Sequence, residues 1–159
     1  ASLLNSFEIA KDQGEDLVFF VEDDYLHFEP MLEEMLATYE RISSQIKHDI
    51  FMCPSDYPYL YTNNEKTNVL IGNKRHWSTV EKTLCTFMTS VNLLNKYWEN
   101  FEKTCKDRND PFEKYINEIY EKEICISPLK SLSLHLTNIN SSYGLAPFID
   151  YKKLWDENK

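Results

Sequence analysis

The sequence feature that most constrains the fold is a short apolar run that ends in three acidic residues. Residues 17–21 read Leu-Val-Phe-Phe-Val, a continuous series of aliphatic and aromatic side chains. Such a run is typical of a strand buried on both faces, as in a sheet that helices cover. The next three residues are Glu22, Asp23 and Asp24. The pattern therefore predicts a buried strand whose carboxyl end presents three carboxylates.

The rest of the chain alternates between helical and strand-like patterns. Apolar spacing predicts helices over residues 2–11, 30–46 and 91–106, and two prolines predict further helix starts, in Asp110-Pro-Phe-Glu113 and at Pro147. Strand-like segments lie at residues 50–53, 68–72, 82–90 and 131–137. Because strands and helices interleave, we predict the α/β class, with a mixed sheet flanked by helices. The length of 159 residues predicts a single domain, residues 1–159.

Composition excludes several classes of protein. The net charge of −9 argues against a nonspecific nucleic-acid binder and against docking on an anionic membrane. The apolar run is far shorter than the roughly 20 residues of a membrane span. The four cysteines include no C-x-x-C pair, and so low a density favours free thiols in a reducing, cytoplasmic compartment.

The acidic triplet is the first candidate site for chemistry. In open α/β sheets, ligands bind at the carboxyl ends of the strands. Adjacent carboxylates repel each other, and a divalent cation that prefers oxygen ligands offsets this repulsion. A solvated acidic turn is the alternative, and the residue types alone leave both interpretations open.

Residues 17–36, from Leu17 to Leu36, resemble the D-x-D segment of the GT-A glycosyltransferases. In that family a hydrophobic strand ends in an E-D-D or D-x-D triplet, and a short loop, a proline and an amphipathic helix follow. The resemblance implies sugar transfer from a nucleotide-sugar donor to a carbohydrate or another hydroxyl acceptor, with Mn²⁺ or Mg²⁺ bridging the diphosphate. It implies Asp24 as the metal ligand, with Glu22 and Asp23 near the ribose or the metal's waters.

Other residues acquire roles from the same resemblance. The family often supplies a further metal ligand from a histidine on a late strand, and His135 fits by its order in the chain. Inverting members use a carboxylate near a helix start as the base, which here implies Asp110 or Glu113, although these two residues also suit a helix cap. His27 and Asp56 are weaker candidates for the same cleft. An aromatic group has two interpretations, an acceptor platform or core packing: Tyr57, Tyr59, Tyr61, His76 and Trp77.

The resemblance covers only the later part of a GT-A domain. The family places several strands before the triplet, where they bind the nucleotide base, whereas 21 residues precede Glu22 here. We therefore expect the C-terminal portion of a GT-A domain, weakly active or inactive alone, with an open sheet edge that invites a homodimer. Two other classes remain open: a nucleotidyltransferase-like enzyme and a non-catalytic binding or assembly module.

Overall fold

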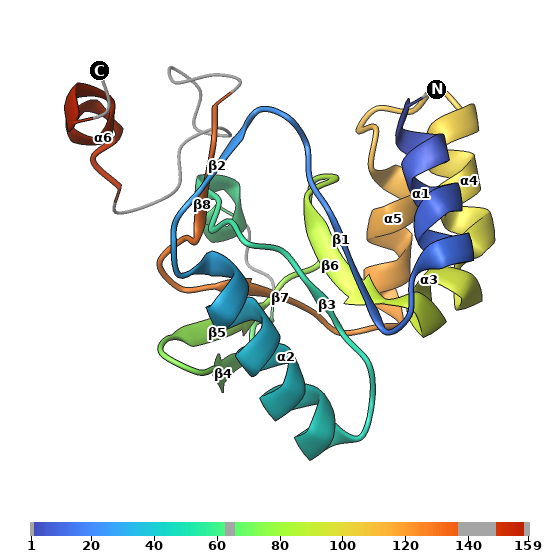
Figure 1. The fold of residues 1–159 in the computed structure, drawn as a ribbon, viewed down its shortest axis with the longest axis horizontal. Coiled ribbons are helices and arrows are strands. Elements are labelled where there is room, and N and C mark those ends of the chain that lie inside the picture. The colour runs from blue at the N-terminus through green and yellow to red at the C-terminus, as the bar shows by residue number, and fades with distance from the viewer. Residues whose placement is uncertain (1, 63–65, 137–148, 158–159) are drawn as a thin grey trace.

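A mixed sheet with helices on both faces forms the body of the molecule (Figure 1). The computed structural model describes residues 2–62, 66–136 and 149–157. The strands are β1 (Leu17–Phe20), β2 (Tyr25–His27), β3 (Phe51–Met52), β4 (Val69–Ile71), β5 (His76–Thr79), β6 (Phe87–Ser90), β7 (Cys125–Pro128) and β8 (Ser133–His135). The α-helices are α1 (Ser2–Gln13), α2 (Met31–Ile46), α3 (Val91–Lys96), α4 (Trp98–Lys106), α5 (Lys114–Asn117) and α6 (Tyr151–Glu157). Two 3₁₀ helices are η1 (Pro58–Tyr61) and η2 (Glu118–Glu121).

The strand directions bring four carboxyl ends to one edge of the sheet. The six-stranded sheet has the order β1-β6-β3-β7-β5-β4, and β2 and β8 form a separate two-stranded sheet. Strand β6 is antiparallel to both β1 and β3, while β3 and β7 are parallel. Strand β5 is antiparallel to both β7 and β4, so β1, β3, β7 and β4 run in the same direction. The acidic triplet after β1 lies at the edge where ligands bind in sheets of this kind.

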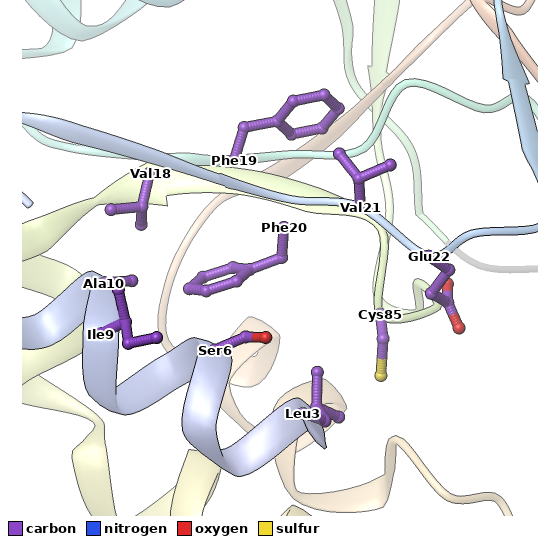
Figure 2. Close-up of a pocket in the computed structure, with 10 residues that line it drawn as sticks. All are labelled: Leu3, Ser6, Ile9, Ala10, Val18, Phe19, Phe20, Val21, Glu22 and Cys85. Atoms are coloured by element: carbon purple, nitrogen blue, oxygen red, sulfur yellow. The ribbon is translucent and has the colours of Figure 1, made fainter.

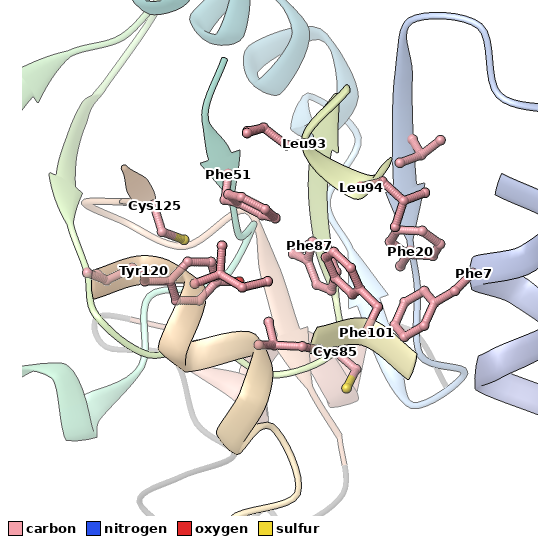
Figure 3. Packing of buried hydrophobic residues seen from close by; sticks show 14 residues of the cluster. Phe7, Phe20, Phe51, Cys85, Phe87, Leu93, Leu94, Phe101, Tyr120 and Cys125 are labelled. Carbon is pink, nitrogen blue, oxygen red and sulfur yellow. The ribbon is translucent and has the colours of Figure 1, made fainter. Parts of the chain in front are cut away.

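Alternating side chains divide the core between the two faces of the sheet. Phe51 and Phe87 pack on the face covered by α1, α3, α4 and α5, and Figure 3 shows their aromatic cluster with Phe7, Phe20 and Phe101. The next residues along the strands, Met52 and Met88, pack on the opposite face against α2. The alternation is the two-residue period of a strand whose two faces are both buried.

Strand β1 lies at one end of the sheet and pairs with β6 alone in the described part of the chain. Val18 and Phe20 point toward α1, whereas Phe19 and Val21 lie on the other side of the strand (Figure 2). A pocket of about 470 Å³ lies between α1 and β1 and reaches Glu22. The side chains of β1 are alternately buried and half-buried, which corrects the prediction of a strand buried fully on both faces.

The expected fold class and two of the expected helices are confirmed. The chain is α/β with a mixed sheet, and helices form over most of residues 2–11 and 30–46. The expected strand 82–90 is too long, because only Phe87–Ser90 joins the sheet. In the first half of that segment, Thr83 bonds instead to Asn117 and to Tyr120. The sequence patterns did not predict three strands, β2, β5 and β7.

Two expected helices differ in their detail. The helix expected over 91–106 is two helices, α3 and α4, that meet at Tyr97, whose hydroxyl bonds to the buried carboxylate of Glu123. The expected cap at Asp110 does not form, because α5 begins at Lys114 and Glu113 precedes it without a side-chain cap. Pro147 lies outside the described residues. Within those residues, no helix has the length and apolar character needed to cross a membrane.

Candidate functional site

The first side chain of the site, Glu22, is held across the sheet by Thr86. The backbone N–H of Glu22 donates to Thr86 Oγ1 at 3.0 Å, and the same hydroxyl donates to Glu22 Oε2 at 3.1 Å. Thr86 is completely buried just before β6, next to the end of β1. One buried hydroxyl therefore fixes both the backbone and the carboxylate of Glu22. From sequence, Thr86 belongs to the threonine-rich segment predicted as the strand 82–90, and the pattern indicates no role for it beyond a strand face.

The small sheet brings His135 to Asp24. Strand β2 starts directly after the triplet and pairs antiparallel with β8, with Tyr25 opposite His135. The imidazole Nε2 of His135 lies 3.1 Å from Asp24 Oδ2, although the two residues are 111 positions apart in the chain. Backbone pairing extends this contact, because Leu136 N–H donates to the carbonyl oxygen of Asp24 at 2.7 Å. The two residues that the resemblance implies as metal ligands therefore lie in direct contact.

Charge interactions connect Glu113 to the same group. Burial raises the pKa of Glu113, and the positive form of His135 acts in the opposite direction. Burial also raises the pKa of Glu22, the hydrogen bond from Thr86 lowers it, and the negative charges of Asp24 and Glu113 raise it further. The charges of four residues therefore act on one another's surroundings: Glu22, Asp24, Glu113 and His135. We call these four residues the edge cluster.

The two remaining predicted site residues lie at the margin. Asp23 is exposed, on the turn between β1 and β2. Asp110 is exposed and lies in the segment before α5. Of the two carboxylates that the resemblance implied as a base, Glu113 is the half-buried one, and its charge acts on Glu22. The sequence spacing did not distinguish between them.

The donor set of the edge cluster fits a divalent cation that arrives with its substrate. Asp24 offers a carboxylate oxygen, which suits Mg²⁺ and Mn²⁺, and His135 offers an imidazole nitrogen, which suits transition metals. The pair therefore favours Mn²⁺ over Mg²⁺. The described residues contain no group of three or more His, Cys, Asp or Glu arranged to hold a metal ion. Asp24 and His135 are the two side chains here that could hold a cation.

The aromatic residues proposed as a platform divide into buried and exposed groups. Trp77 has no exposed surface, and its indole N–H donates to Glu34 on α2, so it belongs to the core. Tyr57 is also buried, and its hydroxyl bonds to that of Tyr25. Tyr59 is half-buried and stacks on Tyr57 with ring centroids 5.2 Å apart. The platform interpretation is therefore wrong for Trp77 and for Tyr57, whose side chains belong to the core.

Four candidates from the sequence remain: His27, Asp56, Tyr61 and His76. His76 is exposed at the start of β5. Tyr61 donates its hydroxyl to both carboxylate oxygens of the buried Asp56 at 2.8 Å, and burial raises the pKa of Asp56. His27 faces the small sheet, where its Nδ1 lies 2.7 Å from Ser133 Oγ. These contacts explain Asp56 and His27 as parts of the framework around the edge cluster.

Neither a protein-family model nor a curated protein sequence matches this chain. The edge cluster and its geometry are therefore the features of the molecule that bear on its function. The strongest geometric facts are the contact between Asp24 and His135 and the clamp that Thr86 forms on Glu22.

Proposed function

We propose that the chain carries the metal and diphosphate site of a GT-A-like glycosyltransferase, which moves a sugar from a nucleotide-sugar donor to a hydroxyl acceptor. The contact between Asp24 Oδ2 and His135 Nε2 at 3.1 Å is the observation that carries the proposal. It joins the end of the apolar strand to a late strand, as the resemblance implies. It also lies at the carboxyl edge of the sheet, where α/β folds bind ligands.

Asp24 and His135 are the residues that would hold Mn²⁺ or Mg²⁺. When bound, the cation neutralises the negative charge that develops on the leaving diphosphate. Glu22 and Asp23 flank this position and contact the donor's ribose or the waters of the cation. The buried hydroxyl of Thr86 keeps the Glu22 carboxylate in place, so this part of the site is preorganised before the donor arrives.

Glu113 is the preferred base, and Asp110 is the less suitable alternative because it lies outside the edge cluster. Glu113 accepts the proton of the acceptor hydroxyl while the acceptor oxygen bonds to the anomeric carbon. The bond from that carbon to the donor phosphate oxygen breaks, and the nucleoside diphosphate leaves, so the configuration inverts. Burial raises the pKa of Glu113, which brings a carboxylate base closer to the pH at which it must accept a proton.

Calorimetric titration of UDP and GDP, with and without Mn²⁺, tests the proposal. We expect Mn²⁺-dependent binding of one nucleotide to the native chain. Asp24→Ala removes a direct metal ligand and is expected to weaken this binding by about 100-fold, at the upper end of the losses seen when outer-shell partners are removed.

Asp12→Ala is the matched control, because it removes an exposed carboxylate on α1 and changes the net charge equally. We expect it to leave nucleotide binding unchanged. Binding that ignores Mn²⁺, or that survives Asp24→Ala, would contradict the proposal. The acidic triplet would then be a solvated turn.

A further inference from the structure

The imidazole of His135 lies against a stack of aromatic rings on the small sheet. The ring of Tyr25 is centred 4.6 Å from that of His135, with an angle of 12° between the planes. The ring of His27 is centred 6.1 Å from that of Tyr25 and inclined by 16°. Tyr25 is thus nearly parallel to the rings of both histidines.

The register of the strands produces this arrangement. Residues opposite each other in an antiparallel pair lie on the same face, as do residues two apart in one strand. Tyr25 is opposite His135, and His27 is two residues after Tyr25. The stack is therefore built into the pairing of β2 with β8.

Tyr25 is itself held from two directions. It is buried, and its hydroxyl bonds to the hydroxyl of the fully buried Tyr57, which follows β3. Tyr57 stacks in turn on Tyr59 in η1, with 14° between the rings. The neighbouring His27 is fixed by the contact of its Nδ1 with Ser133 Oγ. The Tyr25 ring consequently has little freedom to rotate.

We propose that Tyr25 is a positioning residue, which fixes the plane of the His135 imidazole so that Nε2 points at Asp24. A side chain that must be ordered before it can bind a metal binds that metal more weakly, because ordering it costs free energy. Stacking against a fixed ring removes that cost for His135. The inference depends on the proposed metal site, and it adds a residue that the acidic triplet and the histidine do not reveal.

Two substitutions separate the stacking from the hydroxyl. Tyr25→Phe keeps the ring and loses the bond to Tyr57, so we expect Mn²⁺ affinity to fall by no more than about threefold. Tyr25→Leu keeps an apolar side chain and removes the stack, and we expect a loss of about tenfold. Mn²⁺ binding is measured from the electron paramagnetic resonance signal of the free ion.

Nuclear magnetic resonance of the imidazole protons provides a readout that needs no metal. The ring current of Tyr25 shifts the His135 protons upfield, and these are assigned with His135→Gln. We expect Tyr25→Leu to abolish the shift and Tyr25→Phe to retain it. Tyr39→Leu is the matched control, because Tyr39 on α2 is as buried as Tyr25, each being 9% exposed. It controls for the loss of a buried tyrosine.

The outcomes separate this inference from the proposed function. If Tyr25→Leu matches Tyr39→Leu in the His135 shift or in Mn²⁺ affinity, Tyr25 is not a positioning residue, while the metal site stands. If the native chain binds no Mn²⁺, the metal site itself is wrong and the inference fails with it. A lost shift together with weakened Mn²⁺ binding in Tyr25→Leu alone supports the inference.

Discussion

Carboxylates that are shielded from solvent occur at several places in this protein, and those on α2 and in the edge cluster have different surroundings. On α2, Glu34 is 1% exposed and receives hydrogen bonds from Thr38 Oγ1, Trp77 Nε1 and the backbone N–H of Lys74. In the edge cluster, burial raises the pKa of Glu22 and of Glu113. Among the described residues, neither of these two forms an ion pair with a lysine or an arginine.

The difference indicates which carboxylates are structural. The donors around Glu34 come from its own helix and from the β4–β5 hairpin, so this carboxylate fastens α2 to the sheet. In the edge cluster, the negative charges of the three carboxylates repel one another, and the imidazole of His135 opposes this repulsion. Such an arrangement lowers stability and is typical of a site prepared for a cationic partner.

The largest effect is expected at Glu34. Glu34→Ala leaves the buried indole N–H of Trp77 and the N–H of Lys74 without their acceptor, and each such loss costs about 1–3 kcal/mol. We expect the free energy of unfolding to fall by about 3 kcal/mol, measured by urea denaturation. Glu33→Ala is the control, since its ion pair with Lys74 is exposed on both sides and adds little to stability. Equal losses in both variants would mean that Glu34 does not fasten the helix.

A third shielded carboxylate, Glu123, allows the comparison to be tested through the pH dependence of stability. Desolvation opposes its ionisation, but hydrogen bonds from Lys96, Tyr97 and His48 prevail and lower the pKa of Glu123 below 4.5. The resulting stability is present above the unfolded pKa and is lost as pH falls through the folded value. We expect Glu123→Gln to cost about 2 kcal/mol at pH 7, and this difference to shrink in denaturation series below pH 4.5. A constant difference down to pH 3 would contradict this assignment.

The sequence was sufficient for features that depend on local pattern. The apolar run, the proline-led amphipathic α2 and the alternation around His135 each depend on neighbouring residues, and each element forms. Strands β5 and β7 carry serine, threonine or proline and take their character from the strands beside them. These two strands form because neighbouring strands pair with them in the assembled sheet. A local sequence pattern carries no information on that pairing.

The same division applies to the site. The triplet and His135 were singled out by position along the chain, whereas Thr86 contacts Glu22, 64 residues away in sequence, and Tyr25 contacts His135 on another strand. A sequence motif can indicate candidate ligand-binding residues. The residues that hold those side chains in place are found only once the strands are paired. The choice between Asp110 and Glu113 likewise required the fold, because both lie in one four-residue segment.

The smallest effect, with the opposite sign, is expected at Glu22. Glu22→Gln keeps an acceptor for Thr86 and removes the negative charge that Asp24 and Glu113 repel. We expect the free energy of unfolding at pH 7 to rise by about 0.5–1 kcal/mol, with weaker Mn²⁺-dependent nucleotide binding.

The pH dependence of this gain follows from the raised pKa of Glu22. Protonation favours the folded state of the native chain, so the native chain gains stability as pH falls through the folded pKa, and the advantage of Glu22→Gln disappears there. Urea denaturation at pH 7 and pH 4 measures both values, with Asp23→Asn as the exposed control. A Glu22→Gln variant that is less stable than the native chain at pH 7 would place Glu22 with Glu34 among the structural carboxylates, and the contrast between the two regions would fail.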